Sequence, residues 1–158
     1  MLFSGLPFLL SFGDGVEYER LEDWDAVVAT LSSACTAYDI PLAELVLHCH
    51  GDGYPQADHP IGETTFSERS IQLCRPDILV ALHELSHVWL QEAHSKDWAM
   101  GFFALIKQYT PDLFDTEVWT VANSYPQAMV AVREMVHDGI IPENRKFGWN
   151  SGYFPADT

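Results

Sequence analysis

Basic residues are scarce in this 158-residue sequence. Eight lysines and arginines stand against 23 aspartates and glutamates, which gives a formal net charge of −15. A protein with this balance repels the phosphates of nucleic acids and the headgroups of anionic membranes. The sequence therefore predicts neither a nucleic-acid partner nor a membrane partner.

Cysteine is also scarce, and the three cysteines, Cys35, Cys49 and Cys74, are isolated from one another. No CxxC pair occurs, which argues against a disulfide framework and against a zinc ribbon. Free thiols at this frequency are typical of a reducing compartment. We expect the protein to be cytoplasmic.

Long hydrophobic runs are missing as well. The apolar opening segment, residues 1–12, is interrupted by Pro7, carries no basic residue and is too short to span a bilayer. We interpret it as a buried strand, with a secretory signal as the alternative. With 47% hydrophobic residues the chain can build one core, so residues 1–158 are predicted to form a single domain.

The periodicity of apolar residues predicts both helices and strands. Strands are expected in residues 1–12, 42–49 and 64–74, the second inside a sheet and the third either at a sheet edge or in its interior. Helices are expected over residues 21–38, 76–91, 95–109, 110–123 and 124–139, with loops after them. This pattern predicts a compact α+β fold, in which a small mixed sheet packs against helices.

The central motif is His83-Glu84-Leu85-Ser86-His87, an HExxH sequence within an apolar helical pattern. At this spacing the two imidazoles lie about 40° apart on successive turns and can share one metal ion. Glu84 lies beside them and can act as the general base for a metal-bound water. The motif therefore predicts a zinc site with His83 and His87 as ligands.

Together, HELSH (residues 83–87) and HSKDW (residues 94–98) resemble the motifs of the zincin metallopeptidases, most closely the SprT-like and WLM groups. The resemblance implies a zincin-like α+β domain that binds one Zn²⁺ through His83, His87 and His94. It also implies that Glu84 is the catalytic base and that a protein or peptide substrate is cleaved beneath an edge strand.

The third ligand depends on how the chain runs after the motif. On an unbroken helix His94 would lie about 10.5 Å along the axis from His87, too far to share a metal. His94 can therefore bind only if the chain turns back between Gln91 and Ser95, and Ser95 is a suitable cap for a new helix. The alternative is Glu117, which would match the glutamate ligand of minigluzincin-like and ImmA-like peptidases.

Other polar residues have less specific patterns. His48 and His50 alternate onto one face of a strand end, where they are either polar end residues or part of a second metal site. The further ligands of such a site would come from the loop that follows: Asp52, Asp58 or His59. Tyr125 and His137 are candidates for stabilising an oxyanion, or are structural residues.

These observations predict a zinc-dependent metallopeptidase that hydrolyses peptide bonds. The alternative is a non-catalytic protein with a zincin scaffold that binds a partner protein. The presence of Glu84 favours the enzyme, because a purely structural zinc site requires ligands but no base.

Overall fold

The computed structural model describes residues 4–13, 22–48 and 61–143. Within them the fold is α+β, as predicted, with a four-stranded mixed sheet and five α-helices. The chain divides into two compact units, Met1–Gln91 and Glu92–Thr158. The expectation that residues 1–158 form a single domain stays a prediction.

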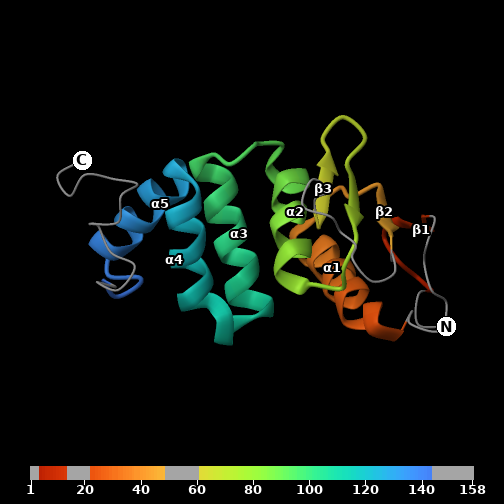
Figure 1. Ribbon diagram of the computed structural model, residues 1–158, viewed down its shortest axis with the longest axis horizontal. Coiled ribbons are helices and arrows are strands. Elements are labelled where there is room, and N and C mark those ends of the chain that lie inside the picture. Colours follow the sequence, from red (N-terminus) through yellow and green to blue (C-terminus); the bar gives the residue numbers. More distant parts are fainter. Residues whose placement is uncertain (1–3, 14–21, 49–60, 144–158) are drawn as a thin grey trace. The chain divides into compact units, whose positions relative to one another are not determined.

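The first unit contains the whole sheet (Figure 1). Its strands are β1 (Leu9–Phe12), β2 (Glu44–Leu47), β3 (Gly62–Thr65) and β4 (Ser70–Leu73), in the order β1-β2-β4-β3. The three strands β1, β2 and β4 are parallel, whereas β3 pairs antiparallel with β4. Parallel neighbours require a crossover, and α1 (Asp25–Tyr38) provides it between β1 and β2.

The two central strands supply the core of this unit. Leu45 and Leu47 of β2 are fully buried, as are Ile71 and Leu73 of β4. The prediction of a strand inside the sheet is confirmed for β2. The opening segment was expected to be a buried strand. Instead, its strand β1 lies at an edge of the sheet, and Leu9 is 63% exposed.

The segment expected to be one strand, residues 64–74, is instead part of a hairpin. A turn over residues 66–69 separates β3 from β4, and the Arg69 amide donates to the Phe66 carbonyl at 3.2 Å. Arg69 adopts a positive φ of 50°, which closes the turn without a glycine. As a result β4 is internal, and β3 forms the edge strand.

Two helices pack in this unit, α1 and α2 (Ile78–Leu90), and Figure 1 shows both on the same side of the sheet. Helix α2 contacts β3, β4 and α1. Helix α1 buries an apolar face that includes Cys35, and burial raises the pKa of this thiol to about 12. Cys35 is therefore a protonated core residue rather than a reactive thiolate.

The second unit is helical: α3 (Lys96–Tyr109), the 3₁₀ turn η2 (Pro111–Leu113), α4 (Phe114–Ser124) and α5 (Pro126–His137). Helix α5 packs against both α3 and α4. The helices predicted for residues 95–139 are confirmed, whereas most of the expected terminal loops lie outside the described residues. Among the described helices, none combines the length and apolar composition needed to cross a bilayer.

Candidate metal centre

Helix α2 positions the first two histidines. Its N-terminus is capped by Asp77, whose carboxylate accepts from the Val80 amide at 3.1 Å. His83 and His87 follow on successive turns, with ring centroids 5.0 Å apart. His87 is only 5% exposed, so the helix and its packing fix this side chain.

The chain leaves α2 through an unusual residue. Gln91 adopts the left-handed conformation, with φ 51° and ψ 40°, and its amide donates to the His87 carbonyl at 2.9 Å. Its side-chain Nε2 also donates to the Val88 carbonyl at 3.0 Å. A left-handed residue in this position redirects the chain at the end of a helix.

The next helix begins after only four more residues. The Ser95 hydroxyl accepts from the Trp98 amide at 3.1 Å and caps α3. Both the break between Gln91 and Ser95 and the capping role of Ser95 are therefore confirmed. His94 lies within this short link.

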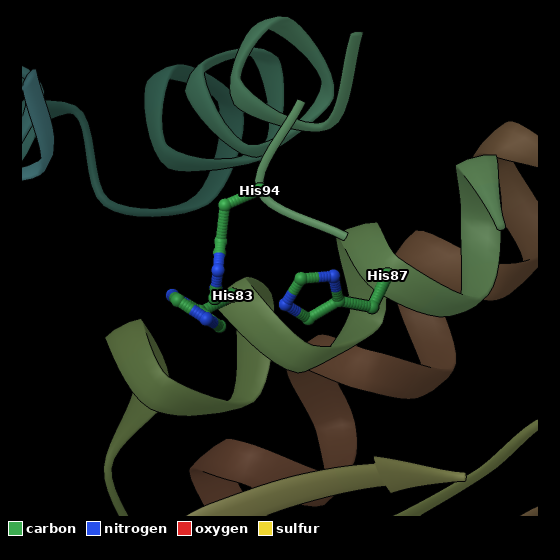
Figure 2. A group of neighbouring side chains, drawn as sticks. All are labelled: His83, His87 and His94. Atoms are coloured by element: carbon green, nitrogen blue, oxygen red, sulfur yellow. The ribbon is translucent and has the colours of Figure 1, made fainter. Parts of the chain in front are cut away.

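The three histidines converge. Ring nitrogens of His83, His87 and His94 all lie within 4.8 Å of one another, and Figure 2 shows His94 reaching from the link toward the two rings on α2. Glu117, the alternative third ligand, is not a member of this group.

The geometry of the group fits a single metal ion. Three nitrogens bound to one tetrahedral zinc at about 2.0 to 2.1 Å would lie about 3.4 Å apart. Shifts of roughly 1 Å or less would bring these rings onto such an ion. Imidazole suits zinc, copper, iron and nickel, so the three histidines could hold a metal ion of this kind, and the donor set does not select one metal.

No family model, curated protein or solved structure matches this chain.

Glu84 is buried next to the histidines, with 7% of its surface exposed. Its Oε2 lies 3.7 Å from His83 Nε2, and its Oε1 accepts from the Thr64 hydroxyl at 3.0 Å. The pKa of Glu84 is raised to about 7, mainly because the carboxyl group is buried. The hydrogen bond from Thr64 acts in the opposite direction, and the charge of Glu63 adds to the increase. A carboxyl group with a pKa near neutrality can both accept and release a proton under physiological conditions.

The edge strand β3 approaches α2 at a glycine. A Cβ on Gly62 would lie 2.6 Å from Val80 Cγ1 and 3.1 Å from Glu84 Cγ, so a larger residue would force the strand and the helix apart. This close approach brings Thr64, two residues further along β3, to the carboxylate of Glu84. Sequence reasoning identified neither Gly62 nor Thr64 as part of the site.

Two of the ligand histidines also contact aromatic rings. Phe66, in the β3–β4 turn, meets His87 edge-on at 5.5 Å. Tyr125 stacks on His94 with its centroid at 3.8 Å. Tyr125 was expected to stabilise an oxyanion or to be structural, and its ring lies against a candidate ligand.

The other described candidates, His48 and His137, do not join the group. His48 follows β2, and its ring fills the space where a Cβ on Gly13 would lie. Its expected companions, His50, Asp52, Asp58 and His59, lie outside the described residues, so the second metal site stays a prediction. His137, in the last turn of α5, has an 89% exposed side chain whose Nδ1 lies 3.2 Å from Asp138.

Proposed function

We propose that this protein is a zinc-dependent metallopeptidase of zincin-like type. The observation that carries the proposal is the position of the Glu84 carboxylate, 3.7 Å from the ring nitrogen of His83 and buried against the ligand group. Three neutral imidazoles hold a metal and leave a coordination position open. A purely structural site has no use for a buried carboxylate beside its ligands.

Each residue has a separate role in this proposal. His83, His87 and His94 hold the ion. Zinc bound there would lower the pKa of its water towards about 7 and polarise a carbonyl group. Glu84 accepts the proton at Oε2, because Thr64 occupies Oε1, and then delivers it to the leaving amine.

The edge strand supports a peptide as the substrate. Among the described residues β3 pairs only with β4, so its outer backbone groups can pair with an extended chain. A substrate added in this way runs past Thr64, which contacts Glu84. Its scissile bond would then lie next to the proposed base.

The test combines metal analysis with one substitution. The purified protein should contain about one zinc and should cleave unstructured peptides, such as a casein digest or a quenched-fluorescent peptide library. Glu84→Gln should keep the zinc and the fold but lower kcat at least roughly 100-fold, because it removes the base and no ligand. Glu134→Gln is the matched control: it makes the same chemical change at an exposed position of α5 rather than of β3, outside the ligand group, and should keep activity.

Two outcomes would contradict the proposal. Equal cleavage by the parent and by Glu84→Gln would exclude Glu84 as the base. A parent protein that binds zinc but cleaves no peptide would favour the alternative, a zincin scaffold that binds a partner protein without catalysis.

A further inference from the structure

His94 is the only one of the three candidate ligands that does not lie on a helix. It lies in the link between α2 and α3, outside both helices (Figure 2). A ligand in such a position would normally lose side-chain freedom when it binds a metal, which weakens binding. Its ring must therefore be held by its neighbours if the site is preorganised.

Two aromatic rings hold it. Tyr125 stacks on His94 with a centroid distance of 3.8 Å and an interplanar angle of 16°. Trp98 meets His94 edge-on at 4.6 Å, with an angle of 84°. Trp98 and Tyr125 also contact each other at 5.4 Å, so each of the three rings touches the other two.

Both supporting rings are themselves fixed. Trp98 is fully buried in the first turn of α3 and stacks on Phe102. Tyr125 lies at the junction of α4 and α5, where its amide donates to the Val121 carbonyl at 3.0 Å. Its carbonyl in turn accepts from the Ala128 amide at 3.1 Å. Tyr125 therefore has its backbone anchored to the helices on both sides.

The orientation of the stack matters for metal binding. Stacking uses the face of the imidazole, whereas the lone pairs of its nitrogens lie in the plane of the ring. Tyr125 can thus fix the plane of His94 without blocking its nitrogens. This stacking contact requires the aromatic ring of Tyr125 but not its hydroxyl group.

We infer that Tyr125, with Trp98, is a positioning residue that holds His94 in its metal-binding orientation before the metal arrives. The inference rests on the metal site of the proposed function and deepens it. It assigns Tyr125 to ligand orientation through its ring, rather than to catalysis through its hydroxyl.

The first experiment measures zinc affinity by competition with a chromophoric chelator. Tyr125→Leu should weaken binding roughly tenfold, within the range that outer residues of metal sites contribute. Tyr125→Phe should stay within about twofold of the parent, because it keeps the stacked ring. The control is Tyr38→Leu, which breaks a ring contact of 5.2 Å with Trp89 and touches no ligand, and it should bind zinc as the parent does.

The second experiment needs no metal. In proton NMR spectra of the zinc-free protein, the ring protons of His94 should be shifted upfield by the stacked ring. The shift should persist in Tyr125→Phe and disappear in Tyr125→Leu. Far-UV circular dichroism of Tyr125→Leu shows whether the helices remain folded, and the phenylalanine variant keeps the test decisive if they do not.

The inference is overturned if Tyr125→Leu binds zinc as tightly as the parent, or if Tyr125→Phe binds as weakly as Tyr125→Leu. Zinc binding without hydrolysis would contradict the proposed function and leave this inference standing. A parent protein that binds no zinc would overturn the metal site and the inference together.

Discussion

The two sides of the candidate metal centre are built in different ways. His83 and His87 are held by α2, whose backbone fixes their spacing, and His87 is almost completely buried. His94 has no helix beneath it and is held by stacking on Tyr125. A helix fixes the backbone from which a ligand side chain extends, whereas a ring contact fixes only the ligand side chain itself. The first arrangement survives the loss of a neighbouring side chain, and the second does not.

The largest expected effect comes from removing the ligands. His87→Ala and His94→Ala should each weaken zinc binding by roughly 100-fold or more, because each removes one of three ligands. The two variants should differ when zinc is absent. His87→Ala should lower the free energy of unfolding by about 2 kcal/mol, as it leaves a cavity, and His94→Ala by about 1 kcal/mol, as it loses a stack.

Isothermal titration with zinc and urea unfolding of the zinc-free variants measure these effects. His137→Ala is the control, because it removes an exposed histidine outside the group. Equal losses of stability for His87→Ala and His94→Ala would mean that the two sides are held equally firmly.

The second prediction concerns pH, because only the helix side of the centre contains the buried acid Glu84. Its pKa in the folded, zinc-free protein is about 7, compared with an ordinary value of 4.5. The folded state therefore binds this proton more tightly than the unfolded state does. Glu84 thus stabilises the fold below pH 4.5, and this contribution is lost as the pH rises to about 7.

The size of the effect follows from the shift in pKa. The zinc-free parent should lose about 3 kcal/mol of unfolding free energy between pH 4.5 and 7, relative to Glu84→Gln. Urea unfolding at several pH values measures the difference between the two proteins. A difference that does not change with pH would contradict the raised pKa.

The smallest expected effect is at Gln91, the joint between the two sides. Gln91→Gly should remove the backbone strain of the left-handed conformation. It also removes the side-chain hydrogen bond to the Val88 carbonyl and increases the conformational entropy of the unfolded chain. The net change should be within about 1 kcal/mol. Gln91→Val should cost roughly 1 to 2 kcal/mol, because a β-branched residue is poorly tolerated at positive φ.

Thermal unfolding of the two variants, with and without zinc, tests this prediction. If Gln91→Val matched the parent in stability and in zinc affinity, the joint would not need its left-handed residue.

The parts of this fold that the sequence predicts are those with local signals. Ser95 caps α3 as expected. The break before it is indicated by Trp98, which on a continuous helix would lie on the side opposite Trp89. The internal position of β2 follows from the high apolar content of residues 42–49. Each of these features depends on residues that are close together in the chain.

Two features that the sequence did not reveal, the hairpin turn and the residue that ends α2, share a physical cause. The hairpin turn at Arg69 and the exit from α2 at Gln91 both use a residue other than glycine at positive φ. Only a few per cent of such residues adopt this conformation, so no turn signal is visible in the sequence. One strand was therefore expected where the chain forms the two strands β3 and β4. The turn after α2 was expected, but Gln91 was not identified as the residue that forms it.

The contacts around the site have a different reason for being unpredictable. Thr64 and Glu84 are 20 residues apart, and His94 and Tyr125 are 31 apart, so no local pattern joins them. They meet only because β3 packs on α2 and because the junction of α4 and α5 lies beside the start of α3. The grouping of the three histidines could be predicted from the two motifs, whereas the contacts of Thr64 and Tyr125 required the fold.

The link between α2 and α3 constrains how sequences of this kind can diverge. Six residues separate His87 from His94, and two of them, Glu92 and Ala93, are exposed. An insertion or deletion there would move His94 off its stack and away from the other histidines. Related chains should therefore keep the length of this link. A search for HExxH followed by six residues, a histidine and a capping serine should recover them where overall similarity has been lost.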